Sequence, residues 1–580
     1  MSFKTNRKHS YYERNGSYSK MMPSIFSVCH PIPNITELEQ VLQEPPDWIY
    51  KVQPIVPRSG RVVKNNVDDC HSGIDEFVVK KRVDSRTVPK VLVCHDYKGG
   101  YQADRYLHNS DEDIVGQGYT FYNWSQIDIF VYFSHHFITI PPLCWINAGH
   151  KNGVKVLGTL ITEFDSGHDM CDKKLFRDIE SMRTFAESLA QVTKLFGFDG
   201  WLLNIENKVT NVQALKEFVP YLNKLIHEDN PGNLVIWYDS VTDTGDLRWQ
   251  NELNSKNRYF FDNCDGIFLN YTWSEKTLEK TAMAAKYRKS DVFVGVDVFG
   301  RNMFGGGKFN TDKAVEVAHR LNLSVAIFAP GWTHETLPVT GTFFESFFNR
   351  DLAFWRSLWP YMYTHPITTY FTTNFYIGLD EDCYNLFSQG IQLSKCLYPS
   401  NLSSIPEHLT SSFPYKCSCI QGSLLGTKNT CLLTKSNLRK DESYIHHLFS
   451  TDIEIRGNTV VFFLTKSVDD ALGVIDVSLL VSTYSGSVKK IVLLGQEKEH
   501  LVDNKSLCEI NRSTFPDIIM NIRDKFYKKI VDERWNLSVY IFTTELSNIL
   551  EIGATILHGN SVLLGAFGVE NADGNFLKNL

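Results

Sequence analysis

An amide and a carboxylic acid stand two residues apart in this chain, at Asn204-Ile205-Glu206. The residues just before them, Trp201-Leu202-Leu203, are apolar and indicate a buried strand. Because residues i and i+2 of a strand point to the same face, Asn204 and Glu206 are expected to lie side by side. A buried polar pair that only caps the strand is the alternative, but glutamate is rarely buried without a partner or a function.

This pairing favours one particular kind of sugar chemistry. Ordinary glycosidases use two carboxylates, and an amide cannot replace the nucleophilic one. A sugar with a 2-acetamido group can supply its own carbonyl oxygen as the nucleophile. Glu206 would then protonate the leaving oxygen and later deprotonate water, while Asn204 would hydrogen-bond the acetamide nitrogen. Tyr238, at the end of the next apolar run, is placed to orient the acetamide oxygen.

Eight short apolar runs could position these residues. Most are nearly continuous rather than alternating, as in strands that are buried on both faces, and they comprise residues 91–97, 128–136, 154–163, 198–206, 234–240, 266–272, 292–300 and 325–332. Helix-like spacing lies between several of them, for example over 175–196. Eight strand–helix units predict a (β/α)8 TIM barrel over residues 89–360. A doubly wound open sheet is the alternative, but no Gly-rich dinucleotide loop follows the first run.

The two flanks of the barrel have a different texture. Residues 1–88 are polar and irregular, and we expect a partly disordered lead-in. Residues 361–580 show short strand-like runs separated by turn residues, for example 459–464 and 537–542. This pattern is typical of one or two C-terminal β-sandwich units, which we expect to brace the barrel rather than to bind sugar.

Active-site residues of such barrels stand at the C-terminal ends of the strands and in the loops that follow. The candidates for substrate binding are polar and aromatic residues at those positions: His95, Tyr101, His135, Glu163, Trp249, Asn270, Trp273, Asp297 and Trp332. The tryptophans could stack on sugar rings or pack beneath loops. No HExxH or carboxylate-rich spacing accompanies the histidines, and Cys417, Cys419 and Cys431 lack paired CxxC spacing, so neither group favours a metal site.

Composition excludes several classes of function. Formal net charge is −7 with no basic stretch, which argues against nucleic-acid binding. No secretory signal and no run of about 18 apolar residues is visible, so we expect a cytoplasmic protein that does not insert in a membrane. Scattered cysteines such as Cys94 and Cys264 are expected to be buried, reduced thiols. We expect no cofactor.

Several of these segments resemble the cytosolic endo-β-N-acetylglucosaminidases of glycoside hydrolase family 85. They follow the family order over about residues 90–335, and they include 93–96, 99–101, 130–136, 141–150, 156–163, 198–207, 237–240, 249–252 and 268–273. The resemblance implies cleavage of the β-1,4 bond between the two core GlcNAc residues of N-glycans on glycopeptides, misfolded glycoproteins or free oligosaccharides. It implies retention through an oxazolinium intermediate, and possible transglycosylation.

The same resemblance implies roles for individual residues. The acid/base of the family corresponds to Glu206, its acetamide-orienting asparagine to Asn204 and its supporting tyrosine to Tyr238. Trp249 and Trp273 resemble the aromatic residues of the acceptor side. Family members often have tryptophan where this chain has Phe164, a change that removes an indole N–H and puts a sugar contact there in doubt.

Two other functions compete with this one. A chitinase-like barrel would carry two further carboxylates on the fourth strand, where this chain has Leu202 and Asn204. A catalytically silent glycan-binding protein on the same barrel is the alternative from a different class. Loss of Asn204 or Glu206 would indicate such a protein, but both residues are present.

Overall fold

The structure is a computed structural model. It describes residues 28–63, 81–84, 88–105, 119–338, 343–375, 415–420, 430–435, 445–456, 459–468, 474–495, 507–509, 516–527, 530, 535–542, 546–558 and 560–571. The first 27 residues of the expected lead-in therefore lie outside the described part of the chain.

Eight parallel strands close into a barrel, as the eight apolar runs predict. Each strand pairs with the next one in the chain, and the last pairs back with the first. The strands are β3 (Val91–His95), β4 (Ile129–Tyr132), β6 (Lys155–Glu163), β7 (Gly200–Glu206), β8 (Leu234–Tyr238), β9 (Gly266–Leu269), β10 (Val292–Asp297) and β11 (Ser324–Phe328). A short strand, β5 (Ile138–Thr139), adds to β6 in the antiparallel direction.

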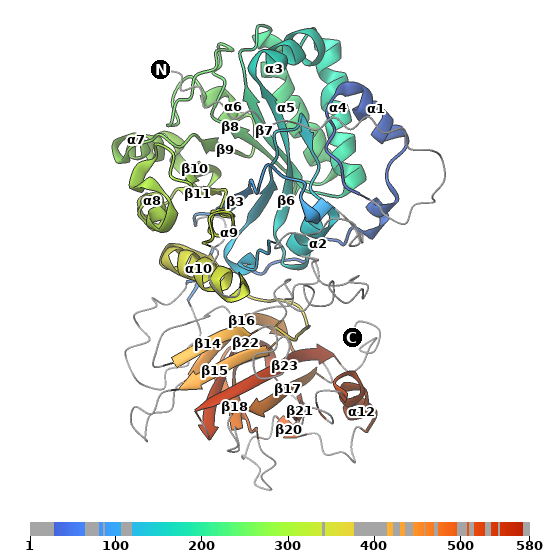
Figure 1. The fold of residues 1–580 in the computed structure, drawn as a ribbon, viewed down its shortest axis with the longest axis vertical. Helices are drawn as coiled ribbons and strands as arrows, with labels where there is room; N and C mark the ends of the chain where they lie inside the picture. Colours follow the sequence, from blue (N-terminus) through green and yellow to red (C-terminus); the bar gives the residue numbers. More distant parts are fainter. Residues whose placement is uncertain are drawn as a thin grey trace.

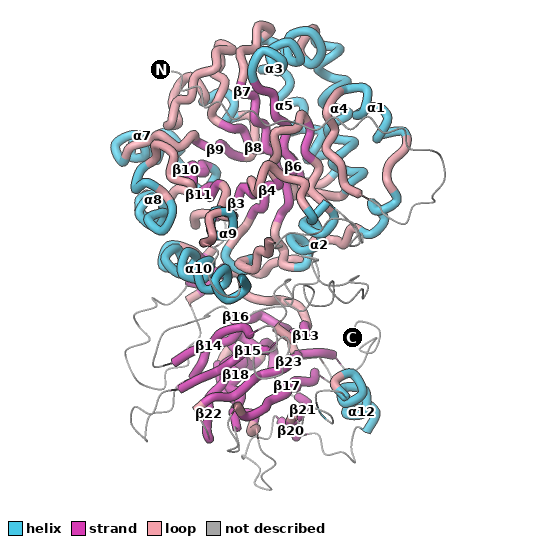
Figure 2. The backbone as a smooth tube through the Cα atoms, viewed as in Figure 1, coloured by secondary structure: helices cyan, strands magenta, loops and turns pink. Residues whose placement is uncertain are grey.

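Helices surround these strands (Figures 1 and 2). They are α2 (Leu143–Lys151), α3 (Phe164–Met170), α4 (Ile179–Phe196), α5 (Val212–Asp229), α6 (Arg258–Asp262), α7 (Glu275–Ala285), α8 (Thr311–Arg320), α9 (Trp332–Glu335) and α10 (Phe343–Leu358). The α4 helix begins four residues later than its apolar spacing predicts. Asp178 accepts a hydrogen bond from the Ser181 amide and so caps the helix there, while Cys171–Leu175 forms a separate π-helical turn. The helix ends where Gly197 takes a positive φ of 66°.

The described part of the lead-in packs against the barrel. It contains α1 (Ile35–Gln43), a 3-10 turn at Asp47–Lys51 and the strands β1 (Arg61–Val63) and β2 (Arg82–Val83). Trp48 is buried against Phe196 at the end of α4. Arg58 donates hydrogen bonds to three barrel carbonyl oxygens, those of Trp124, Ile127 and Asn152, at 2.6–2.9 Å.

The C-terminal region is rich in β-structure, as the sequence predicts, and its described strands form two antiparallel sheets. One contains β13 (Phe371–Thr373), β14 (Tyr415–Ile420), β15 (Thr430–Lys435), β17 (Thr459–Ser467), β20 (Leu507–Glu509), β21 (Asn536–Phe542) and β23 (Ser561–Asn571). The other contains β16 (Ile445–Glu454), β18 (Val474–Thr483), β19 (Val488–Leu493) and β22 (Leu546–His558). Phe449 of one sheet packs against Phe567 of the other within a shared core, which makes a single sandwich, and α12 (Pro516–Lys525) lies at its edge (Figure 1).

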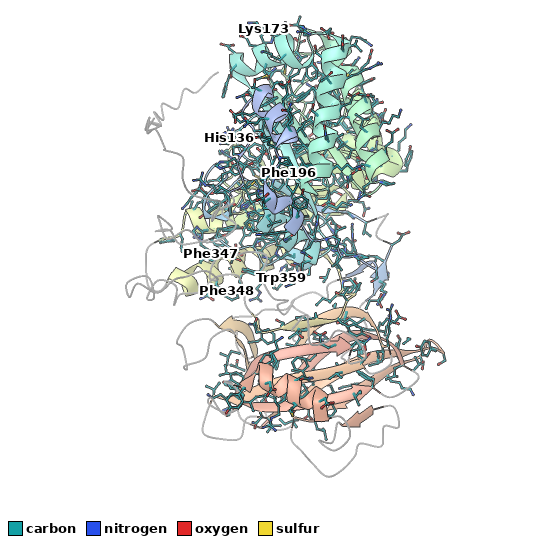
Figure 3. The ribbon with its side chains drawn as sticks, turned by 90° about the vertical axis from the view of Figure 1, so that its right-hand side faces the viewer. His136, Lys173, Phe196, Phe347, Phe348 and Trp359 are labelled. Carbon is teal, nitrogen blue, oxygen red and sulfur yellow. The ribbon has the colours of Figure 1, made fainter. Side chains whose placement is uncertain are left out.

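One segment after α10 joins the barrel to the sandwich. Strand β12 (Tyr363–Thr364) pairs with β1, and the backbone of Ile367 pairs with Ser450 and Asp452 of β16. The side chains of Phe347, Phe348 and Trp359 lie on the side of the barrel that faces the sheets, whereas Lys173 lies at the far end (Figure 3).

The described helices include none of sufficient length and apolarity to cross a membrane.

Cys94 and Cys264 are free and buried, as expected.

Candidate active site

A cavity of about 290 Å³ opens at the C-terminal ends of the barrel strands. Its lining comes from every strand of the barrel or from the loop that follows that strand: Cys94, Asp96, Phe133, His135, Glu163, Leu202, Asn204, Glu206, Tyr238, Trp249, Phe268, Asn270, Tyr271, Asp297, Arg301 and Phe328. This is the end of the barrel at which the sequence places the candidate residues.

Leu202, Asn204 and Glu206 occupy alternate positions of β7 and all line the cavity. The amide of Asn204 is 96% buried, and it donates a hydrogen bond to the Glu206 carboxyl group. Its other polar atom, Oδ1, is buried without a hydrogen-bond partner among the described residues. The site therefore has an acceptor that is ready for an N–H donor, since a buried polar atom left without a partner is costly.

The pKa of Glu206 is raised to about 7, because burial and, to a lesser extent, the negative charge of Glu163 outweigh the lowering by the Asn204 hydrogen bond and His135. Near neutral pH the protonated and the charged forms of Glu206 are therefore both populated. A carboxylic acid with a pKa near the working pH can donate a proton in one step and accept one in the next.

Glu163 lies directly opposite Glu206, because the two residues are partners in the β6–β7 register. One Glu163 oxygen is 3.0 Å from Nδ1 of His135, which follows β4. This hydrogen bond raises the pKa of His135. The carboxylate of Glu163 is therefore already paired with a side chain of the protein.

Tyr238 stands on the next wall, at the end of β8. Its hydroxyl donates to Oδ1 of Asn270 at 2.9 Å. Burial raises the pKa of Tyr238 well above its usual range, so the phenol keeps its proton at neutral pH. Trp249, in the loop after β8, is 41% exposed and forms part of the same wall.

The wall formed by the end of β10 carries an ion pair. Asp297, at the end of β10, is buried and accepts from Nε of Arg301 at 2.7 Å and from the backbone N–H of Phe299 at 3.1 Å. Arg301 lies over the rings of Phe299 and Phe328. Asp96, at the end of β3, is mostly buried, which raises its pKa.

Eight of the predicted residues line this cavity: Asn204, Glu206, Tyr238, His135, Glu163, Trp249, Asn270 and Asp297. The other four predicted substrate contacts do not line it. His95 points away from the cavity because its neighbours Cys94 and Asp96 point into it, and His95 stacks instead on core aromatic rings such as Phe130. Tyr101 is buried, and its hydroxyl donates to the Ile140 carbonyl oxygen at 2.8 Å.

The other two of these four residues are tryptophans. Trp273 is buried against Phe304 and donates its indole N–H to the Gly295 carbonyl oxygen at 2.8 Å. Trp332 is buried at the start of α9 beneath Phe309 and the guanidinium of Arg350. Both tryptophans are therefore packed inside the protein, which is the alternative to stacking on sugar rings. Phe164, in contrast, is 79% exposed with a φ of 57°, and it does not line the cavity.

The structure also adds residues that sequence reasoning did not select. Arg301 is the clearest, and its position soon after the seventh apolar run was a usable signal. The apolar floor formed by Leu202, Phe133, Phe268 and Phe328 carried no such signal, because these residues look like ordinary strand interior. No three or more His, Cys, Asp or Glu side chains are grouped to hold a metal ion in the described part of the chain.

The fold and the site define a (β/α)8-barrel protein in whose mouth the carboxyl group of Glu206 lies beside the amide of Asn204. Residues 101–383 match the model of glycosyl hydrolase family 85. The human cytosolic endo-beta-N-acetylglucosaminidase is 47% identical over 294 residues, which cover 50% of this chain and 38% of the human protein. Cytosolic endo-beta-N-acetylglucosaminidase 2 of Arabidopsis thaliana is 36% identical over 450 residues, which cover 72% of this chain and 62% of that protein.

A solved structure has the same fold. The glycoside hydrolase domain of Endo-D from Streptococcus pneumoniae R6 superposes with a TM-score of 0.61 at 16% identity, covering 92% of this chain and 82% of that one. The barrel of the chain is therefore similar to the proteins of glycosyl hydrolase family 85. It spans 38–62% of the length of the curated relatives that it matches.

Proposed function

We propose that this protein is an endo-β-N-acetylglucosaminidase that cleaves the β-1,4 bond between the two core GlcNAc residues of N-glycans. The reaction would be substrate-assisted and would retain configuration at C1. One observation carries the proposal: a carboxylic acid with a pKa of about 7 lies beside a buried amide whose oxygen has no partner within the described residues. An N-acetyl sugar supplies both missing parts, an N–H donor and an internal nucleophile.

In the first step the proton of Glu206 moves to the glycosidic oxygen as the bond from that oxygen to C1 breaks. The acetamide oxygen of the same sugar forms a new bond to C1 from the opposite face and closes an oxazolinium ring. Positive charge develops on the acetamide nitrogen, so its hydrogen bond to Oδ1 of Asn204 strengthens in the transition state. Asn204 therefore stabilises the transition state more than the bound substrate.

In the second step the Glu206 carboxylate removes a proton from water. The water oxygen bonds to C1 while the bond from C1 to the acetamide oxygen breaks, which restores the acetamide and the protonated acid. Two inversions at C1 give net retention. A sugar hydroxyl that takes the place of water would give transglycosylation by the same route.

Other residues of the mouth have supporting roles in this proposal. Tyr238 lies on the neighbouring strand β8 and lines the same cavity as Glu206, and its hydroxyl would contact the acetamide. Trp249 offers an exposed ring at the rim for packing against a sugar. His135, Glu163, Asn270 and Asp297 are the remaining candidates for contacts with sugar hydroxyls.

The proposed substrates are N-glycans on glycopeptides or misfolded glycoproteins, and free oligosaccharides. The names of the curated relatives support a cytosolic location for the reaction. Within the chain, residues 89–360 would form the catalytic barrel and residues 361–580 would brace it. The pairing of Ile367 with the sandwich, four residues after the β1–β12 pairing begins, supports bracing.

The test is mass spectrometry of a high-mannose glycopeptide incubated with the purified protein at neutral pH. The expected product is a peptide that carries one GlcNAc residue, together with the released glycan. A peptide without any GlcNAc would overturn the assigned bond. A glycopeptide that remains intact, also when complex-type and free glycans are offered, would favour a silent glycan-binding protein.

A further inference from the structure

A ring of hydrogen bonds holds the hydroxyl of Tyr238 from behind the cavity wall. That hydroxyl donates to Oδ1 of Asn270 at 2.9 Å, and Nδ2 of Asn270 donates to Oδ1 of Asn251 at 2.7 Å. The backbone N–H of Asn251 donates to Oδ2 of Asp239 at 2.7 Å. Asp239 is the chain neighbour of Tyr238, so the ring begins and ends at the tip of β8.

The polarity of this ring is set by a backbone group. The N–H of Thr272 is 3.0 Å from one of the two terminal side-chain atoms of Asn251, and a backbone N–H can only donate. The atom of Asn251 at this position must therefore be Oδ1. The Asn270 atom that meets the same oxygen must be its NH2 group. This leaves the Asn270 oxygen facing Tyr238, and the Tyr238 proton must point toward it.

The turn that carries Asn251 is itself held firmly. Asp239 is 99% buried and accepts from the backbone N–H groups of Gln250 and Asn251 and from Nδ2 of Asn257, at 2.7–3.1 Å. Asn251 has a φ of 56°, which asparagine and glycine tolerate better than most residues. Asn251 does not line the cavity, whereas Tyr238, Asn270 and Trp249, which stands two residues before Asn251, do.

We infer that Asn251 is a positioning residue that fixes, through Asn270, the place and the proton direction of the Tyr238 hydroxyl. This inference rests on the proposed function, in which that hydroxyl contacts the substrate acetamide. Without the Asn251 oxygen, the Asn270 amide can rotate and present its NH2 group to Tyr238. The phenol then loses its fixed acceptor, and fewer molecules hold it in the productive orientation.

Two substitutions distinguish the effect of the side-chain hydrogen bonds of Asn251 from the effect of its backbone conformation. Asn251→Gly keeps the positive φ without strain but removes the acceptor. Asn251→Asp keeps an acceptor of the same shape for both donors and tolerates the same φ. Asn322→Gly is the matched control, since Asn322 also has a φ of 56° but lies exposed between α8 and β11 at the other end of the barrel.

The measurement is kcat and KM for glycopeptide cleavage by full-length proteins of verified fold. Asn251→Gly should lower kcat about tenfold, the effect of one well-placed hydrogen bond, with KM changed less than twofold. Asn251→Asp should retain kcat within about threefold, and Asn322→Gly should match wild type. A rise in KM at constant kcat would overturn the inference, because it would mean that Asn251 acts through the sugar contact of Trp249.

A double-mutant cycle with Tyr238→Phe gives a readout that a merely structural role would not change. In the Tyr238→Phe protein no hydroxyl remains to be positioned, so Asn251→Gly should add less than a twofold loss. A full additional tenfold loss would overturn the inference. Cleavage by wild type tests the proposed function separately: a wild type that cleaves alongside an equally active Asn251→Gly variant refutes only the role of Asn251.

Discussion

Two carboxyl groups at opposite ends of the barrel have pKa values shifted in opposite directions. Glu206 ends β7 at the mouth, and Asp128 directly precedes β4 at the bottom. Burial acts on both groups and raises both pKa values. At Asp128 the charges of Arg61, His365 and Arg58 outweigh burial and hold the pKa well below its usual range. At Glu206 the hydrogen bond from Asn204 and the charge of His135 are too weak to balance burial, and the pKa rises to about 7.

The contacts explain the difference. Asp128 is 2.6 Å from Nη2 of Arg61, which comes from the lead-in, and 2.9 Å from Nε2 of His365, which follows α10. It also accepts from the backbone N–H of Val91, the first residue of β3. A permanent charge here holds three distant segments together. At the mouth, an acid that exchanges its proton near neutral pH is suited to proton transfer instead. Neighbours, rather than depth of burial, therefore decide which carboxyl group is structural.

The largest expected effect is at the mouth. Glu206→Gln should lower kcat/KM by about 10³-fold, since the amide has nearly the same shape but cannot transfer a proton. Steady-state kinetics on a glycopeptide measure this loss. Thermal unfolding above pH 7 should show a stability equal to or slightly above wild type, because the variant buries no charge. A variant with more than a tenth of wild-type activity would contradict the assigned role.

At the bottom the same kind of change should affect stability instead. Asp128→Ala leaves the buried Arg61 without its partner and should lower the free energy of unfolding by about 3 kcal/mol. Denaturant unfolding measures this loss, and kcat per folded molecule should be unchanged. The matched control is Asp229→Ala, which breaks an exposed pair with Lys194 and should cost less than about 1 kcal/mol.

The pH dependence of stability tests whether the charge of Asp128 causes the loss in the Asp128→Ala variant. Because the pKa of Asp128 is lowered in the folded state, its contribution is present above its unfolded pKa of about 3.9 and is lost as pH falls below that value. The difference between wild type and Asp128→Ala should therefore shrink below about pH 4. A difference that stays constant down to pH 3 would contradict the role of the Asp128 charge.

Asn204→Ala should produce an intermediate effect at the mouth. It removes the proposed acceptor for the acetamide N–H, a contact that would strengthen as charge develops, and should lower kcat about 10²-fold. KM should change by less than the loss in kcat, and kinetics on the glycopeptide separate the two. A rise in KM as large as the expected loss in kcat, with kcat unchanged, would mean that Asn204 recognises the substrate without stabilising the transition state.

The smallest effect concerns the proton of Glu206. Its pKa of about 7 predicts that kcat/KM of wild type falls about tenfold per pH unit above pH 7, as the acid loses its proton. The charge of Glu163 raises this pKa, so Glu163→Gln should move the falling limb to lower pH. We expect the limb to move by less than one pH unit. His135 without Glu163 would also lose positive charge, and that charge lowers the pKa of Glu206. Asp165→Asn, two residues away on the exposed start of α3, is the control and should leave the profile unchanged.

Local pattern was sufficient to predict the barrel. Strands buried on both faces need nearly continuous apolar residues, and each of the eight runs contains one barrel strand. The same regularity correctly placed Asn204 beside Glu206, because alternation along a strand depends on the backbone alone. Alternation did not say which face of β3 points into the barrel, so His95 was predicted in the cavity, whereas its neighbours Cys94 and Asp96 occupy it.

The sequence by itself therefore determined the architecture, the position of the acid–amide pair and the resemblance to the family, all of which depend on neighbours in the chain. Tertiary structure decided the direction of loop side chains such as Trp273 and Trp332, and the pairing of Asp128 with Arg61 and His365. It also set the pKa of Glu206, because burial and nearby charge come from residues far apart in the chain.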